Sequence, residues 1–244
     1  MKINEPESRF LNNFDIIRAL AALLVIYSHT YAVTGSAVDY RGSSLDPLKE
    51  VSGTYNLGNL GVFIFFITSG YLIPKSALRS KSITNYFKKR TLRILPALIF
   101  VSAVMALIIG PIYSKLTIFE YFSNRETYLY LTTFNLYLMP YTLPGVFVDN
   151  PTPNIVNGPL WTLSAEFTCY IIVAIFAYLK ILKKFNTILI IHLTVLSFFI
   201  FVDINATPIS SVPTSYYLLF PLRFLGGNST IIFYLYFSSG MLLS

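Results

Sequence analysis

Charged residues are scarce in this sequence, and cysteine is almost absent. Only 12% of the 244 residues are charged and 55% are hydrophobic, whereas an ordinary soluble domain has about 25% charged residues. The lone Cys169 excludes an intrachain disulfide and leaves thiol redox chemistry without support. Together with a mean hydropathy of +0.62, these scarcities exclude an ordinary soluble domain and indicate an integral membrane protein.

Acidic residues are missing from the two segments in which most of the basic residues gather. The formal net charge is +7, and the excess lies in two short segments, 75–93 and 180–184. Basic loops of membrane proteins stay on the cytoplasmic side, so this distribution predicts membrane topology and argues against nucleic-acid binding. We interpret both segments as cytoplasmic loops, and the topology that follows places the N-terminus in the cytoplasm as well.

Hydrophobic runs recur along the whole chain, and one bilayer crossing needs about 20 helical residues. Runs that fit a crossing lie at about 14–34, 57–74, 94–113, 160–179 and 185–202, and a sixth is expected within 216–243. Pro96 would then lie in the first turn of the third crossing, where proline is tolerated. Residues 128–143 are too short and too interrupted for a span, so we expect an interfacial or re-entrant element there. The predicted fold class is all-α, a polytopic transmembrane helical bundle of about six crossings.

The first hydrophobic run contains an arginine and a histidine. Arg18 and His29 are eleven residues apart, which in a helix puts them on one face and roughly 16 Å apart along the axis. Asp15 lies one turn before Arg18 and could pair with it. Intramembrane ionisable groups usually face protein or water, but Arg18 could also snorkel to the surface and His29 could be an interfacial side chain. The spacing alone leaves both interpretations open.

An acidic residue lies inside the run 160–179. Gly158 and Pro159 mark a helix start, and Glu166 follows at a depth of roughly 10 Å, too far in to cap the first turn. Glu166 is either half of a structural ion pair, a protonated acid, or a group that handles or orients a proton beside Trp161, Thr162 and Ser164.

Arg90 and Arg93 lie three residues apart immediately before the third run. They share a helix face, and forked guanidinium groups suit phosphate oxygens. Topology alone explains the charge but not this placement. Ser69-Gly70 could bend the second crossing or admit a neighbour. His192 is most simply an interhelical hydrogen-bond partner, and Cys169 a small hydrophobic side chain.

Four motifs, taken in order, resemble those of the membrane acyltransferase 3 family. They are FDIIRALAALLVIYSHT, LGVFIFFITSGYLI, KKRTLRILPAL and GPLWTLSAEFTCYI. The residues that match are Arg18 and His29 in Arg-x10-His, Phe65, Phe66, Ser69 and Gly70 in a phenylalanine-rich stretch, Arg90 and Arg93 in Arg-x-x-Arg, and Trp161, Leu163 and Glu166 in Trp-Ser-Leu-x-x-Glu. Thr162 replaces the usual serine of the last motif, which keeps a hydroxyl.

The resemblance implies a membrane-bound O-acyltransferase that moves an acetyl group from acetyl-coenzyme A to a hydroxyl of a cell-surface carbohydrate. His29 would be the general base and Glu166 a second catalytic group, while Arg18, Arg90 and Arg93 would bind the donor. Whether His29 acts directly or carries the acyl group is open. The side chains expected to line the substrate site are Asp15, Ser69, Trp161, Thr162 and Ser164. We expect no metal ion and no permanently bound cofactor.

Members of that family generally have about ten crossings, and this chain ends after about six. We therefore expect residues 1–244 to form one membrane acyltransferase domain that is incomplete at its C-terminus. A transporter or flippase of glycan or acyl intermediates, and a non-catalytic fragment, are the alternatives. The expected partners are acetyl-coenzyme A, a carbohydrate or lipid-linked glycan, and membrane lipids. The expected location is the bacterial inner membrane, with a multi-pass arrangement.

Overall fold

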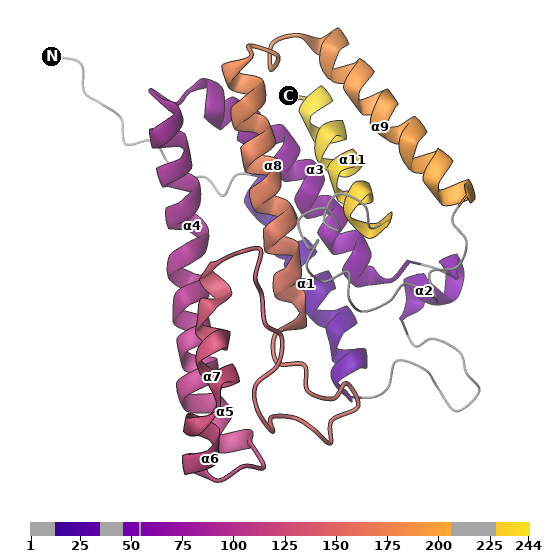
Figure 1. Ribbon diagram of the computed structural model, residues 1–244. Coiled ribbons are helices and arrows are strands. Elements are labelled where there is room, and N and C mark those ends of the chain that lie inside the picture. The colour runs from indigo at the N-terminus through magenta and orange to yellow at the C-terminus, as the bar shows by residue number, and fades with distance from the viewer. Residues whose placement is uncertain (1–12, 35–45, 54, 206–227) are drawn as a thin grey trace, which may run out of the picture.

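The computed structural model describes residues 13–34, 46–53, 55–205 and 228–244. Within these ranges the chain forms helices joined by turns, and its β-structure is an isolated bridge between Ser114 and Val146. The prediction of an all-α fold is confirmed. The helices are α1 (Asn13–Thr34), α2 (Pro47–Ser52), α3 (Leu57–Leu78), α4 (Ile83–Val104), α5 (Gly110–Tyr113), α6 (Ile118–Ser123), α7 (Arg125–Tyr130), α8 (Trp161–Tyr178), α9 (Phe185–Asn205) and α11 (Asn228–Leu242) (Figure 1).

Four helices of the described part are long and apolar enough to cross a membrane. They are Asn13–Tyr31, Leu57–Leu78, Ile83–Tyr113 and Gly158–Tyr178, and they correspond to the first four predicted crossings. Shorter apolar helical stretches follow at Phe185–Phe201 and Ile231–Leu242, where the fifth and sixth crossings are expected. The total of six crossings stays a prediction, and residues 216–225 of the last one lie outside the described residues.

The basic segment 75–93 is helical over most of its length, so its interpretation as a loop is wrong. Helix α3 continues to Leu78 and α4 already begins at Ile83, where the Ser82 side chain accepts a hydrogen bond from the backbone N–H of Asn85. Pro96 consequently lies in the interior of α4 and not in a first turn. Lysine and arginine are good helix formers, so the helix can continue through basic residues outside the membrane. The change in hydropathy therefore marks where the helix meets the membrane surface and not where the helix begins.

Helix α3 lies between α1 and α11, and glycines set its distance from both. A Cβ at Gly61 would meet the carbonyl oxygen of Ala21 in α1, and one at Gly70 would overlap the Phe237 carbonyl of α11. Gly240 of α11 is pressed in the same way against Ile67 of α3. Small residues at such crossings let helix backbones approach closely inside a membrane. The Ser69-Gly70 pair therefore admits a neighbouring helix.

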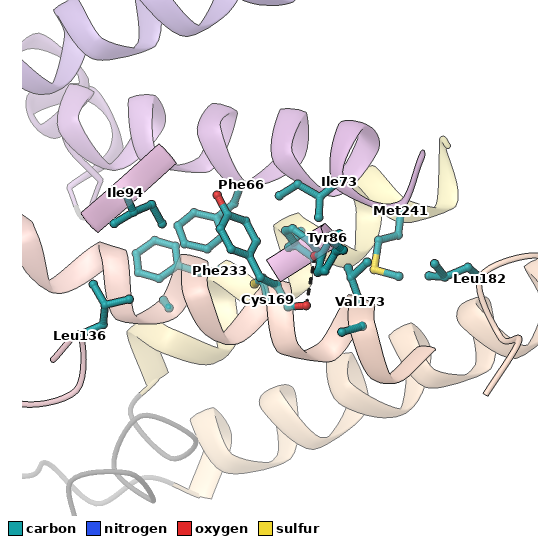
Figure 2. Close-up of a cluster of buried hydrophobic side chains, with 14 of the residues drawn as sticks. Phe66, Ile73, Tyr86, Ile94, Leu136, Cys169, Val173, Leu182, Phe233 and Met241 are labelled. Atoms are coloured by element: carbon teal, nitrogen blue, oxygen red, sulfur yellow. Dashed lines mark hydrogen bonds between the residues drawn. The ribbon is translucent and has the colours of Figure 1, made fainter. Parts of the chain in front are cut away.

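Aromatic and aliphatic side chains fill the space between α3, α4, α8 and α11 (Figure 2). The rings of Phe66 and Phe233 stack with their centroids 4.8 Å apart. Cys169 is fully buried in the same cluster, as expected of a small hydrophobic side chain. The hydroxyl of Tyr86 donates a hydrogen bond to the carbonyl of Tyr170 at 3.1 Å, which joins α4 to α8.

The chain between α5 and α8 forms a second, smaller cluster beside the far end of α4 (Figure 1). A π-helical turn, Met105–Ile109, links α4 to α5, and the Ala106 carbonyl there accepts a hydrogen bond from the buried Tyr121 hydroxyl at 2.8 Å. Helices in this segment have at most six residues, far below the length of a span. Residues 114–157 thus contain no helix long enough to cross a bilayer, and it stays a prediction that they begin and end on one side of the membrane as an interfacial element.

Candidate functional site

A cavity of about 430 Å³ opens between α1, α3, α4 and α8, within the size range typical of ligand sites. Most of its wall is apolar. Its lining residues are Arg18, Val62, Phe65, Phe66, Ser69, Arg93, Ile94, Ala97, Leu98, Val101, Leu160, Thr162, Leu163 and Glu166. Two cations, one carboxylate and two hydroxyl groups thus face a shared apolar space.

The cavity unites half of the site residues expected from the sequence. Those that line it are Arg18, Ser69, Arg93, Thr162 and Glu166. Those that do not are Asp15, His29, Arg90, Trp161 and Ser164. Each motif of the sequence contributes to the wall, and helix packing decides which member of each motif does so.

Arg18 turns from α1 toward α3. Its Nη2 donates a hydrogen bond to the hydroxyl of Ser69 at 3.4 Å, and its buried Nε has no hydrogen-bond partner among the described residues. The expected pairing with Asp15 does not form, because Asp15 is exposed while Arg18 reaches the cavity. The guanidinium therefore keeps donors available for a ligand, since arginine carries five N–H groups in a planar fork.

Glu166 projects from α8 into the same cavity. The hydroxyl of Tyr170, one turn further along α8, donates a short hydrogen bond to its Oε1. Among the described residues Glu166 forms no ion pair. Tyr170 is fully buried, so its hydroxyl holds the carboxylate in a fixed direction.

Arg90 lies behind the cavity wall. Its Nη2 donates to the Ser76 hydroxyl at 2.5 Å, and its guanidinium lies over the rings of Tyr86 and Tyr170 at 5.8 and 5.6 Å. Cation–π contacts of this kind stabilise a cation that has left water. Arg90 thereby joins α4 to α3 and α8 and supports the tyrosine that orients Glu166, while Arg93 faces the cavity.

His29 lies outside the cavity, toward the other end of α1. Its Nδ1 is 2.8 Å from the carbonyl oxygen of Val25. A carbonyl can only accept, so this contact assigns the ring proton to Nδ1 and leaves Nε2 unprotonated in the neutral imidazole. This tautomer leaves Nε2 free to accept a proton.

Trp161 and Ser164 serve the packing of α8. Trp161 lies against Phe233 of α11 with the ring centroids 5.2 Å apart. The buried Ser164 hydroxyl donates a short hydrogen bond to the Leu136 carbonyl. His192 of α9 has its Nδ1 2.8 Å from the hydroxyl of Ser238 in α11, as expected of an interhelical hydrogen-bond partner.

Tyr170 is the site residue that the sequence interpretation missed. It follows Glu166 by four positions, which places both side chains on one helix face, so this spacing could have revealed it. No comparable signal marks Leu98 or Val101, because any apolar residue of α4 could have faced the cavity. In the described ranges, no group of three or more His, Cys, Asp or Glu side chains could hold a metal ion.

Replacing Ser164 by alanine should destabilise the protein without altering the cavity. The Leu136 carbonyl would lose its donor in a buried position, which costs about 1–3 kcal/mol in the free energy of unfolding. Thermal unfolding in detergent measures the effect. Thr162→Ala is the control, because the Thr162 hydroxyl donates to Pro159 within its own helical turn. Equal stability of the Ser164→Ala and Thr162→Ala variants would contradict the structural role of Ser164.

Comparisons with known proteins give a consistent result. Residues 11–244 match a family described as an acyltransferase domain. An O-acetyl transferase of Shigella phage Sf6 is 35% identical over 232 residues, which cover 91% of this chain and 62% of the relative. Nodulation protein 10 of Rhizobium leguminosarum bv. viciae is 35% identical over 180 residues, covering 69% of this chain and 44% of the relative. The chain thus spans less than two thirds of the length of either relative. No solved structure matches it.

Proposed function

The chain belongs to the acyltransferase 3 family, and from this premise we propose that it transfers an acetyl group from acetyl-coenzyme A to a hydroxyl of a cell-surface carbohydrate. The phage relative is named an O-acetyl transferase, which supports acetyl as the group that is transferred. The acetyl-coenzyme A donor and the carbohydrate acceptor are part of the proposal.

The observation that carries the proposal is the cavity that joins Arg18 and Arg93 to Glu166 within apolar walls. Guanidinium groups form strong, forked hydrogen bonds to phosphate and carbonyl oxygens. The donor would place its polar groups at Arg18 and Arg93 and its thioester arm along Phe65, Phe66 and Leu98. Arg90, which does not line the cavity, would support this site through Tyr170.

His29 would act as the general base. The acceptor hydroxyl oxygen attacks the carbonyl carbon of the thioester, and Nε2 of His29 takes the hydroxyl proton. The C–S bond then breaks, and the proton passes to the departing sulfur as free coenzyme A thiol. Since His29 lies about 16 Å beyond Arg18 along α1, an extended donor arm would reach from the arginines toward the imidazole.

Glu166 would balance the positive charge of the two arginines when the donor is absent and orient polar groups of the bound ligand. Its Oε1 is already engaged by the Tyr170 hydroxyl, which leaves the other carboxylate oxygen for a ligand. Glu166 would act as the second catalytic group if this free oxygen contacts the thioester or the acceptor hydroxyl.

The orientation in the membrane follows from the basic residues. Lys88 and Lys89 are exposed on the first turns of α4, close to Arg93. Exposed lysines and arginines gather on the cytoplasmic side of a membrane protein, where acetyl-coenzyme A is made. We therefore propose a multi-pass protein of the bacterial inner membrane that receives its donor from the cytoplasm and has its N-terminus there.

Release of free thiol tests the proposed function. The purified chain, given acetyl-coenzyme A and an acceptor glycan, should release coenzyme A thiol and acetylate the glycan. His29→Ala should reduce the rate by about 100-fold or more, because general-base catalysis contributes about 10²–10⁴-fold. His192→Ala is the matched control and should keep the native rate.

Glycan movement without thiol release would favour a transporter or flippase. A native rate in the His29→Ala variant would contradict the role of His29 as general base. A chain that neither consumes the thioester nor moves glycan would be a non-catalytic fragment.

Loss of Arg93 should weaken donor binding. Arg93→Ala is expected to raise KM for acetyl-coenzyme A about tenfold or more, since a charge-assisted hydrogen bond contributes about 1.5–3 kcal/mol. Lys89→Ala removes an exposed cation from the same helix and should leave KM within about twofold. Steady-state kinetics at varied donor concentration measures both, and equal effects of the two variants would show general electrostatic attraction in place of a specific contact.

A further inference from the structure

Asp46 is the one charged side chain that is buried in the described part of the chain, with 4% of its surface exposed. A buried carboxylate needs hydrogen bonds to replace its lost water. Its Oδ1 accepts from the backbone N–H groups of Leu48 and Lys49 at 3.1 and 3.2 Å. The N–H of Leu57, the first residue of α3, donates to the same carboxylate at 3.1–3.2 Å. One side chain thus caps α2 and also accepts the first N–H of α3, whose N-cap residue is Asn56.

The carboxylate of Asp46 also reaches α1. Its Oδ2 accepts a hydrogen bond from the hydroxyl of Ser28 at 3.1 Å, and Ser28 directly precedes His29. Gly58 makes room for this contact, because a Cβ there would lie only 3.1 Å from both Cβ and Oγ of Ser28. Asp46 therefore fastens the far end of α1 to the beginning of α3, beside the proposed base.

The neighbouring hydroxyl groups of α1 do not make such a connection. Thr30 donates to the Tyr27 carbonyl, and the Tyr31 hydroxyl donates to that of Tyr27 at 2.6 Å. Both bonds stay within α1. Ile26 and Tyr27 are exposed, and this end of α1 packs on α3 through Val25 at Gly61 and Ser28 at Gly58. The Ser28 hydroxyl adds a directional bond to that packing beside His29.

We propose that Asp46, acting through Ser28, is a positioning residue that aims Nε2 of His29. The imidazole is fixed to its own helix by the bond from Nδ1 to Val25, and the helix is fixed to α3 by the bond from Ser28 to Asp46. Two consecutive hydrogen bonds thus connect the imidazole to α3 and restrain the direction of Nε2. This inference rests on the proposed function, in which that nitrogen takes the acceptor's proton.

Ser28→Ala is the most direct test, because it breaks the connection to α1 and leaves the bonds of Asp46 to α2 and α3 intact. It should lower kcat about tenfold and leave KM for acetyl-coenzyme A within about twofold, since small misplacements of a reacting group cost rate more than binding. Ser28→Thr keeps the hydroxyl and should restore kcat. Thr30→Ala, on the other side of His29, is the matched control and should keep the native kcat. Asp46→Asn should lower kcat in the same way as Ser28→Ala.

A second readout does not depend on activity. Diethyl pyrocarbonate modifies accessible imidazoles, and His192, the other histidine of the chain, serves as the internal reference. Ser28→Ala should change the modification rate of His29 relative to His192 by about threefold or more, because the ring is no longer held in one direction. Thr30→Ala should leave that ratio unchanged.

The two readouts separate the failure of this inference from that of the proposed function. Unchanged kcat and unchanged His29 modification in Ser28→Ala would overturn the positioning role, even where His29→Ala is inactive. An altered modification ratio in a chain without transferase activity would support the positioning of His29 and overturn the function assigned to it.

Discussion

A cation inside a membrane must face protein or water, and this constraint explains the arrangement around α1. Arg18 satisfies it by turning to Ser69 of α3 and into a cavity shared with Glu166. The glycine contacts that bring α3 against α1 and α11 set the distance at which that reach is possible. Tyr170 and Arg90 then hold the opposite wall. The cavity thus lies where α1, α3, α4 and α8 pack around the half-buried guanidinium of Arg18.

Hydropathy predicted most of the spanning helices because apolar length is the property that a bilayer selects. Hydropathy did not predict the start of α4. The apolar run begins where the helix enters the membrane, whereas the helix itself already begins at Ile83. Residues 206–227, which include part of the last predicted crossing, lie outside the described ranges.

The site was predictable where one helix carries the information. The cost of buried charge pointed to Arg18 and Glu166, which both line the cavity, whereas the face that helical spacing predicts for Arg18 and His29 stays a prediction. Spacing could not tell Arg90 from Arg93, because a step of three residues leaves the two side chains only about 60° apart on one helix face. The packing of α3 and α8 decides that Arg93 lines the cavity while Arg90 contacts Ser76 and Tyr170. Asp46 lies between predicted crossings, and its bonds to the first turns of two helices depend on a fold that one stretch of sequence does not specify.

We propose that the cavity between α1, α3, α4 and α8 receives the acyl donor. An experimental structure of the purified protein with acetyl-coenzyme A tests it most directly. We expect donor density within the cavity, with phosphate or carbonyl oxygens in hydrogen-bond reach of Arg18 and Arg93 and the thioester directed toward His29. Donor density on another surface, with the cavity filled by lipid, would contradict it.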